Sequence, residues 1–287
     1  MAAAISGSTK VLALLGHPVA HSLSPRLHNA ACEALGLDMV YVTFDVEPAA
    51  LPAAVDGLRA LGVAGANVTV PHKERVAALL DTLEGAAASL RTVNTIVNRD
   101  GRLSGHNTDV AGFSRALCAG LPGKPAGSRY VVFGAGGAAR AVVWGLVALG
   151  AARVSIYNRT HEKAVALAAE ARNWASPEGA CEVEATVLSG LAARIDDAQV
   201  VVNATSVGLE SGLKDIPFPV DSLSSKHTVM DLVYDTQPTV FLQKAGEKGA
   251  HLISGVSMLL EQAALSFTLW TGRKPPLLDM KRALELV

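Results

Sequence analysis

The sequence predicts an α/β protein that is built as two domains with mainly parallel sheets. Apolar strand-like runs alternate with amphipathic helical ones, which is typical of strands joined by helices. The loop LPGKPAGS at 121–128, rich in proline and glycine, separates two stretches of this pattern. The length of 287 residues, half of them hydrophobic, is enough for two modest domains, each with its own core.

Composition and charge argue against several other classes of protein. No apolar run approaches the roughly 18–20 residues that cross a bilayer, and the first residues lack the features of a secretory signal. A net charge of −1 argues against a general nucleic-acid surface. Cys32, Cys118 and Cys181 are widely spaced and form no CxxC pair, so we expect a reduced, cytoplasmic protein without a disulfide framework or a metal site.

In the first half, strands and helices follow one another with clear stop signals. Apolar runs predict strands at 11–15, 40–46, 65–70 and 92–98. Ser24 and Pro25 are typical of an N-cap followed by proline at the first helical position, and Gly36 ends that helix. Further helices are predicted at 48–61 and 74–80, and a turn at Gly101.

A break follows Asp109, where a linking helix is expected over 110–119. The second half then begins with a strand at 129–133. Two long helices close the chain at 256–271 and 277–286 without a strand between them. We therefore expect them to pack on the first half, which gives a substrate domain of 1–109 plus 255–287 and a cofactor domain of 110–254.

A glycine-rich segment directly between a predicted strand and a predicted helix indicates a dinucleotide site. In the pattern G-x-G-x-x-A, the first glycine permits the tight turn and the second lets the backbone approach a pyrophosphate. The final alanine keeps the helix close to the sheet, and the helix N-terminus faces the anion. An ordinary glycine-rich turn is the alternative, but the context favours a cofactor site. Its predicted residues are Gly134, Ala135, Gly136, Gly137, Ala138 and Ala139.

The end of the next strand predicts a preference for NADP over NAD. NAD-selective sites place Asp or Glu about 20 residues after the glycines, but here the strand at 153–157 runs into Asn158, Arg159 and Thr160. Arg159 is suited to a 2′-phosphate, and Lys163 lies one helical turn further on. The alternative is that Arg159 is a solvated surface arginine.

Two further strand ends are expected to border the nicotinamide. The strand that begins at Val200 runs into the polar loop that ends at Gly208, and the segment 229–234 is similar. Loops at the carboxyl ends of parallel strands line the ligand crevice. Thr205 in the first of these loops is a predicted cofactor-binding residue.

The first half offers hydroxyls and amides that suit a small polar ligand. Ser22 and Ser24 lie at a helix start, where backbone N–H groups favour a carboxylate, although capping is an equal alternative. Asn67 and Thr69 share one strand face. Further polar residues near strand ends are Asn94, Asn107 and Asp109, and turn chemistry is the alternative for each, most of all for Asn107.

A lysine stands at the end of the apolar strand in GANVTVPHK. Pro71 stops the strand, and Lys73 follows two residues later. The residue either serves solubility or points into a cleft and moves a proton.

Eight segments resemble the shikimate dehydrogenase family, in the family's order: HSLSP, GANVTVPHK, VNT, GHNTD, GAGGAAR, NRT, NATSVG and GVSMLLEQA. The resemblance covers the chain from about Gly16 to Gln262. It implies two α/β domains flanking a cleft, the C-terminal one a Rossmann-type doubly wound parallel sheet. It also implies reduction of 3-dehydroshikimate to shikimate with NADPH, in aromatic amino-acid biosynthesis.

The same resemblance implies roles for individual residues. Lys73 and Asp109 match the catalytic pair, in which lysine, with an ordinary pKa of about 10.4, gives a proton to the developing alkoxide. Residues that match substrate binders are Ser22, Ser24, Asn67, Thr69, Asn94, Tyr234 and Gln262. The cofactor segments match at 134–139 and 158–160, and Gly255 and Met258 of GVSMLLEQA complete the predicted cofactor-binding set.

The sequence departs from the family pattern in two places. Tyr234-Asp235-Thr236-Gln237-Pro238 replaces a common Tyr-Asn-Pro, and Lys163 stands where an arginine is frequent. Two rival functions remain open: a quinate/shikimate dehydrogenase that uses NAD, and a non-catalytic sensor of NADPH or shikimate. No nucleic-acid or membrane partner is expected, and the protein is expected to be a monomer or a homodimer.

Overall fold

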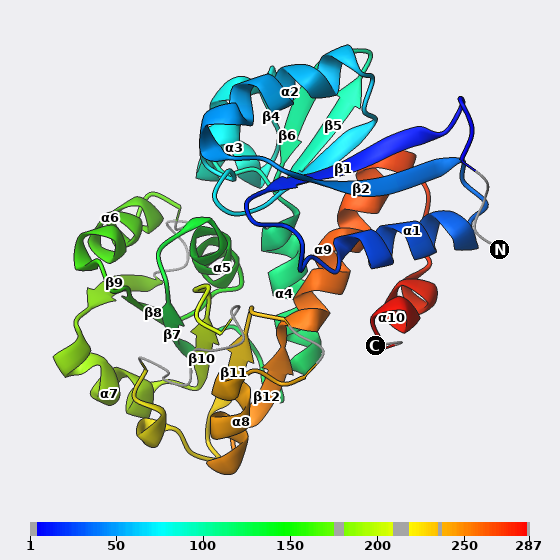
Figure 1. The fold of residues 1–287 in the computed structure, drawn as a ribbon. Coiled ribbons are helices and arrows are strands. Elements are labelled where there is room, and N and C mark those ends of the chain that lie inside the picture. The colour runs from blue at the N-terminus through cyan, green and yellow to red at the C-terminus, as the bar shows by residue number, and fades with distance from the viewer. Residues whose placement is uncertain (1–4, 175–180, 209–217, 235–236, 286–287) are drawn as a thin grey trace. The chain divides into compact units, whose positions relative to one another are not determined.

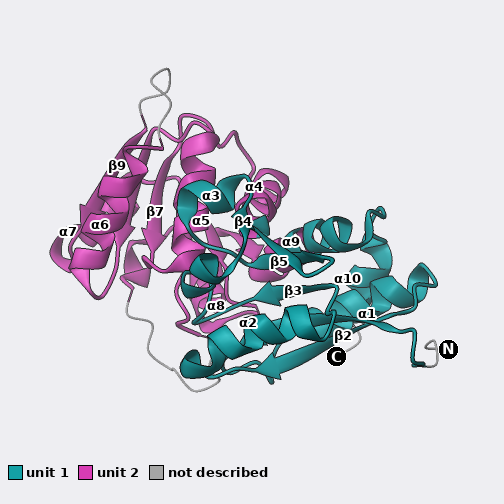
Figure 2. Cartoon of the chain, turned by 90° about the horizontal axis from the view of Figure 1, so that it is seen from above, with its two compact units in different colours: residues 1–108, 262–287 teal, residues 109–261 magenta. Residues whose placement is uncertain are grey.

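The computed structural model describes residues 5–174, 181–208, 218–234 and 237–285 (Figure 1). The chain divides into two compact units, which Figure 2 shows in two colours. Unit 1 comprises residues 1–108 and 262–287, and unit 2 comprises residues 109–261. Each unit contains one six-stranded sheet covered by helices. The predicted α/β class with two domains is therefore confirmed.

The sheet of unit 1 is mixed, with the strand order β2-β1-β3-β5-β6-β4. The first three strands along the chain run parallel, while β5 pairs antiparallel with both of its neighbours. The strands are β1 Lys10–Gly16, β2 Met39–Asp45, β3 Gly65–Val68, β4 Thr82–Leu83, β5 Thr95–Arg99 and β6 Arg102–His106.

Alternate residues of β1 show how the unit 1 sheet is covered on both faces. Ala13 and Leu15 pack in a core with the buried side of α2, whereas Leu12 and Leu14 pack in a second core with Trp270 of α9. Successive strand residues point to opposite faces, so an uninterrupted apolar run such as VLALL is required here. The helices that belong wholly to this unit are α1 Ser24–Ala34, α2 Leu51–Ala60, α3 Ala86–Leu90 and α10 Leu277–Glu285, with short 3₁₀ turns at Pro48–Ala50 and Arg75–Leu79.

Unit 2 is a doubly wound parallel sheet with the order β12-β11-β10-β7-β8-β9, and every neighbouring pair is parallel. The order reverses between β7 and β10, which is the switch point where open α/β sheets bind ligands. The strands are β7 Arg129–Phe133, β8 Arg153–Tyr157, β9 Glu182–Thr186, β10 Val200–Asn203, β11 Thr228–Asp231 and β12 His251–Ser254.

The helices of unit 2 lie on both faces of this sheet (Figure 1). Val132 of β7 packs in one core with α5 and α6, and Val131 and Phe133 pack in the opposite core with α7 and α8. The helices are α5 Gly137–Ala148, α6 His161–Ala171, α7 Leu188–Asp197 and α8 Val240–Glu247. Two longer helices, α4 Thr108–Gly120 and α9 Gly255–Thr271, contain the points at which the chain passes between the units.

Most predicted elements are confirmed, and two predictions about unit 1 are wrong. Three of the five strand pairings in its sheet are parallel, in line with the prediction, and the short segment 95–106 adds an antiparallel hairpin around Asp100 and Gly101, both at positive φ. The segment predicted as a helix over 74–80 is a five-residue 3₁₀ turn. Helix α1 includes Ser24, so Leu23 and not the serine occupies the N-cap position. The predicted end of the last helix, Leu286, lies outside the described residues.

Helix α10 packs against α1 within unit 1, as Figure 1 also shows. The division into a substrate domain of 1–109 plus 255–287 and a cofactor domain of 110–254 stays a prediction. Within the described ranges, no helix is both long and apolar enough to cross a membrane.

Candidate active site

The loop between β1 and α1 holds the two predicted serines. Ser24 is buried at the first position of α1, and its backbone N–H donates to Ser22 Oγ at 3.3 Å. Ser22 is half-buried. The two hydroxyls therefore lie together at a helix N-terminus, where the backbone dipoles favour a negatively charged group.

The end of β3 brings Thr69 beside this loop. Thr69 N donates to Leu15 O at 2.9 Å, and a Cβ placed on Gly16 would lie 2.3 Å from Thr69 Cγ2. Only a glycine leaves room for this methyl group, so Gly16 fixes how closely Thr69 approaches the β1–α1 loop. Thr69 therefore lies against the end of β1, where the loop that carries Ser22 and Ser24 begins.

Lys73 lies in the turn after β3, and a backbone hydrogen bond joins this turn to the segment that leads into β5. Its carbonyl accepts from Val93 N at 2.8 Å, so the lysine backbone lies beside the residue that precedes Asn94. The Lys73 side chain is half-buried. Its neighbour His72 is fully buried and bonds through Nε2 to Val46 O at 2.6 Å, which is a structural role.

Asn94 and Gln262 meet directly, although 168 residues separate them in the sequence. Asn94 Nδ2 lies 3.3 Å from Gln262 Oε1 and 2.8 Å from Thr108 Oγ1, and Asn94 Oδ1 accepts from Thr108 N at 2.7 Å. The last bond satisfies a backbone N–H at the start of α4 that the helix itself cannot satisfy. Asn94 therefore connects β5 to the first turns of α4 and to α9.

Behind Asn94 lies a group of buried neutral polar side chains that we call the amide–hydroxyl cluster. Its members are Asn67, Asn94, Thr95, Thr108, Ser266 and the hydroxyl of Tyr41. The sequence predicted Asn67 and Asn94 but missed the others. A signal for Ser266 was present, because it stands four residues after Gln262 on the same helix and so shares its face.

Asp109 follows Thr108 in the first turn of α4 and is 4% exposed. A carboxylate in the first turn is stabilised by the positive end of the helix dipole. Asp109 belongs to unit 2 and Lys73 to unit 1. Asn107 donates to both Thr92 O and Thr92 Oγ1, which agrees with the turn chemistry considered as its alternative role.

In unit 2, the glycine-rich turn between β7 and α5 fits a dinucleotide. Gly134 has φ +110°, and a Cβ there would lie 2.8 Å from Ala204 O, so a glycine is required on both counts. A Cβ on Gly136 would meet nothing within 4 Å, and this glycine is exposed. The backbone is therefore open at the place where a pyrophosphate would approach the N-terminus of α5.

The end of β8 carries the predicted 2′-phosphate residues. Asn158 Nδ2 donates to Thr160 O at 2.8 Å and shapes the turn that leads into α6. Three side chains of this turn and helix, Arg159, Thr160 and Lys163, are exposed. Two cations without a carboxylate at the strand end are the donor set that suits a phosphate ester.

The ends of β10 and β11 are joined by a second polar group, which we call the carboxylate cluster: Asp231, Asn203, Thr239 and the N–H of Val233. Asp231 accepts from Asn203 Nδ2 at 2.8 Å, from Thr239 Oγ1 at 2.5 Å and from Val233 N at 3.0 Å. Burial raises the pKa of Asp231 to about 6, and these hydrogen bonds act in the opposite direction. The cluster fixes the starts of two loops that carry predicted ligand residues.

Thr205, Tyr234, Gly255 and Met258 lie around this cluster. Thr205 donates through N and Oγ1 to Asn203 Oδ1, while a Cβ on Gly255 would lie 2.7 Å from Asp231 O. Met258 is buried in a hydrophobic core of unit 2, and Tyr234 is half-buried. Their ligand roles stay predictions. Asp235 and Thr236 of the unusual loop lie outside the described residues.

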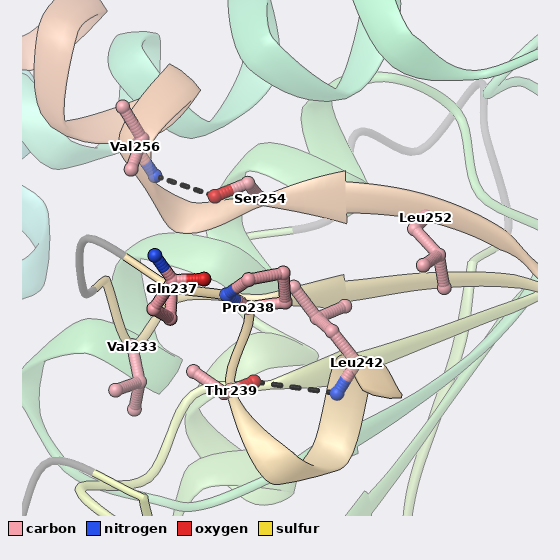
Figure 3. Close-up of a pocket in the computed structure, with 8 residues that line it drawn as sticks. All are labelled: Val233, Gln237, Pro238, Thr239, Leu242, Leu252, Ser254 and Val256. Atoms are coloured by element: carbon pink, nitrogen blue, oxygen red, sulfur yellow. Dashed lines mark hydrogen bonds between the residues drawn. The ribbon is translucent and has the colours of Figure 1, made fainter. Parts of the chain in front are cut away.

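A hollow of about 310 Å³ in unit 2 is lined in part by Val233 and Thr239 of the carboxylate cluster (Figure 3). It lies between the end of β12 and the start of α8, and Leu242, Leu252 and Val256 are among its lining side chains. No predicted site residue lines it. In the part of the chain that the structure describes, no group of three His, Cys, Asp or Glu side chains is arranged to hold a metal ion.

Three family models match successive parts of the chain. Residues 14–96 match the shikimate dehydrogenase substrate binding domain, residues 121–209 match shikimate/quinate 5-dehydrogenase, and residues 255–285 match the shikimate 5′-dehydrogenase C-terminal domain. The first and last of these segments fall largely in unit 1, and the middle one falls in unit 2.

Relatives and solved structures agree with this result. The chain is 47% identical to a shikimate dehydrogenase (NADP⁺) of Moorella thermoacetica over 282 residues, which are 98% of this chain and 94% of the relative. Two solved shikimate dehydrogenases have the same fold. One, in complex with NADP⁺, has a TM-score of 0.90 at 38% identity, with 99% of this chain and 97% of that chain covered. The other, from Thermus thermophilus with NADP(H) and shikimate, has a TM-score of 0.84 at 39% identity, with 96% and 98% covered. On these grounds, the chain belongs to the shikimate dehydrogenase family.

Proposed function

We propose that this protein catalyses the reversible, NADPH-dependent reduction of 3-dehydroshikimate to shikimate. The observation that supports this most strongly is a grouping in unit 1, where Asn94 bonds to Gln262 and the Lys73 backbone bonds to Val93, the residue before Asn94. Nearly the whole length of the chain is shared with NADP⁺-dependent shikimate dehydrogenases. A cytoplasmic location suits a soluble biosynthetic reaction of this kind and is part of the proposal.

The polar side chains of unit 1 would hold a small hydroxylated acid. Ser22 and Ser24, at the N-terminus of α1, would bind its carboxylate. Thr69, Asn94 and Gln262 would bind ring hydroxyls, because amides and hydroxyls can donate to and accept from an alcohol. This division of labour gives the ligand one fixed orientation.

Lys73 would act at the reacting oxygen. During reduction, negative charge grows on the ketone oxygen, and a cationic ammonium both stabilises that charge and supplies the proton. Asp109 would orient the ammonium and accept a hydrogen bond from a neighbouring substrate hydroxyl. In the reverse direction Lys73 would receive the alcohol proton.

The residues of unit 2 would bind NADP(H), which supplies the hydride. The open backbone around Gly136 and the N-terminus of α5 would hold the pyrophosphate. Arg159 and Lys163, with Thr160, would hold the 2′-phosphate by charge-assisted hydrogen bonds. Thr205, Gly255 and Met258 would border the nicotinamide, with Tyr234 near the substrate.

A quinate dehydrogenase that uses NAD is the second candidate, since one matching family model covers shikimate and quinate 5-dehydrogenases. The exposed cations after β8 favour NADP, because an NAD site would place an acid there. Initial rates with shikimate and quinate, each with NAD⁺ and NADP⁺, separate the two candidates. A binding protein without catalytic activity would show no turnover with any of the four pairs.

Replacement of the proposed proton donor gives the sharpest test. We expect Lys73→Ala to lower kcat by at least about 100-fold while the Kd for shikimate changes little, since proton transfer by a positioned group contributes about 10²–10⁴-fold. Stopped-flow or steady-state absorbance at 340 nm measures the rate, and calorimetry measures binding. The matched control is Lys10→Ala, an exposed lysine of the same unit. Near-normal turnover of the Lys73 variant would exclude the proposed role.

A further inference from the structure

We propose that Ser266, Thr95 and Tyr41 are positioning residues for the substrate, and that they act through Asn67 and Asn94. This inference rests on the proposed function, which it deepens. It adds three residues to which the sequence assigned no role: Ser266 and Tyr41, which lie outside the family motifs, and Thr95, the last residue of the VNT motif.

The amide of Asn67 is already committed to neighbours inside the protein. Its Nδ2 lies 3.0 Å from Asn94 O, 3.2 Å from Thr95 Oγ1 and 3.1 Å from Ser266 Oγ, and Asn67 is only 5% exposed. A backbone carbonyl can only accept, so the Nδ2 end must face Asn94 O. The Oδ1 end then faces the Tyr41 hydroxyl, which donates to it at 2.8 Å. Both N–H groups are thus used within the cluster, which fixes the orientation of the Asn67 amide.

Ser266 occupies the centre of the amide–hydroxyl cluster. Its hydroxyl lies within hydrogen-bond distance of side chains from β3, β5 and α4: Asn67 Nδ2, Thr95 Oγ1 at 2.8 Å and Thr108 Oγ1 at 3.2 Å. It also reaches the carbonyl of Gln262 at 3.0 Å, one turn earlier on α9. Ser266 is completely buried, so water cannot replace its hydroxyl without a rearrangement.

The cluster acts on residues that would touch the substrate. Thr95 Oγ1 donates to Asn94 Oδ1 at 3.1 Å, and Asn94 Nδ2 lies 3.3 Å from Gln262 Oε1. Removing the Ser266 hydroxyl takes one acceptor from Asn67 Nδ2 and removes the donor to the carbonyl of Gln262. Asn94 and Gln262 then lose the support that fixes their amides, and a ligand-binding group that is loose by a fraction of an ångström binds less well.

Tyr41 is held in place by aromatic packing. Its ring stacks on His28 with 4.5 Å between ring centroids and an interplanar angle of 18°, and Trp270 packs at 6.1 Å. Tyr41 is 2% exposed, so its hydroxyl has one orientation toward Asn67. The hydroxyl therefore supports Asn67 from the side opposite Ser266.

Steady-state kinetics of Ser266→Ala in the full-length enzyme test the inference. We expect the KM for shikimate to rise about tenfold, with the KM for NADP⁺ within twofold of wild type, because unit 2 is untouched. The matched control is Thr268→Ala on the same helix. Thr268 also bonds to the carbonyl four residues earlier, at 3.0 Å, but it is exposed and outside the cluster. The control should leave both KM values unchanged.

Tyr41→Phe provides a second test that does not depend on the stability of the first variant. It keeps the stacked ring and removes only the hydroxyl, so we expect about a threefold rise in the KM for shikimate alone. Unchanged KM values for shikimate in both variants would overturn the inference, as would an equal rise for shikimate and NADP⁺. If wild-type enzyme fails to oxidise shikimate, the proposed function is what fails, and the two results are thus distinguishable.

Discussion

The two units hold their ligand-facing segments in place with buried polar clusters of different chemistry. The amide–hydroxyl cluster of unit 1 contains no ionisable group that titrates near neutral pH, whereas the carboxylate cluster of unit 2 is built around Asp231. Both clusters lie where strands end and both connect segments far apart in sequence. The two clusters differ in that only the cluster of unit 2 has a carboxylate at its centre.

A buried carboxylate and a buried amide differ in the strength of the hydrogen bonds they accept and in the free-energy cost of their burial. Asp231 accepts three hydrogen bonds, and bonds to a charged acceptor are about twice as strong as neutral ones. Its complete burial, however, penalises the charged form and raises its pKa to about 6. The amides of unit 1 avoid that penalty but need several neighbours each. We therefore expect the two units to respond to pH in opposite directions. Asp231 contributes most to the stability of unit 2 at low pH, whereas burial lowers the pKa of His28 in unit 1 to about 3, so that unit 1 loses stability as the pH falls below about 6.5.

Removal of the Asp231 carboxyl should have the largest effect on folding. Asp231→Ala leaves three buried donors without an acceptor, and each such donor costs about 1–3 kcal/mol, so we expect a loss of about 3–5 kcal/mol in the free energy of unfolding. Urea unfolding followed by circular dichroism measures this loss. Asp231→Asn is the matched control. It keeps one oxygen for Asn203 and Val233, and its amide can donate to Thr239. A loss in the alanine variant no larger than in the asparagine variant would contradict this view.

The pH dependence of unfolding follows from the raised pKa of Asp231. Its ordinary pKa is 3.8 and its folded value is about 6, so between these values the folded chain binds more protons than the unfolded chain. The contribution of Asp231 to the free energy of unfolding is therefore largest below about pH 4. Its contribution falls as the pH rises toward 6, by about 3 kcal/mol in all and by about 1 kcal/mol between pH 5 and 7.

The difference between wild type and Asp231→Asn isolates this contribution from those of other carboxyls. Exposed acids with lowered pKa, such as Asp81 beside Arg59, act in the opposite direction but are present in both proteins. The free energy of unfolding of the wild type should therefore fall relative to that of Asp231→Asn as the pH rises. A gap that stays constant from pH 4 to 7.5 would show that Asp231 does not titrate as described.

The same contrast explains how much the sequence could predict. Unit 2 follows local rules, because each buried parallel strand is a continuous apolar run and the glycines mark the turn after β7. The strands at 129–133 and 153–157 were predicted to the residue. In unit 1 the strand at 92–98 and the turn at Gly101 were predicted, but β6 was missed, because it contains Ser104 and Gly105 and has no strong strand composition. Its existence depends on pairing with β5, which is a tertiary effect.

The candidate site divides in the same way. Residues next to a strong local signal, such as Gly134 after β7 or Lys73 after Pro71, could be named from motifs. Asn67 and Asn94 also lie in motifs, but the cluster that they form could not be predicted, because its members are separated by up to 199 residues and only the fold brings Asn67 to Ser266. Thr95 and Tyr41 resemble ordinary strand residues until their hydroxyls are seen to face buried amides. Family motifs therefore identify ligand-binding residues more readily than the residues that hold those side chains in position.

The smallest effect on folding is expected at the exposed end of unit 2, where side chains should serve the ligand alone. Arg159→Ala removes a cation outside both clusters, so its free energy of unfolding should stay within about 0.5 kcal/mol of wild type. The KM for NADPH should rise about tenfold or more, because a charge-assisted hydrogen bond to phosphate is lost, while the KM for NADH stays within twofold. Arg172→Ala is the matched control, since Arg172 is exposed at the opposite end of α6. Equal changes in the KM for NADPH and the KM for NADH would mean that Arg159 does not bind the 2′-phosphate. A large loss of stability would mean that the contrast between buried clusters and exposed ligand residues does not hold in unit 2.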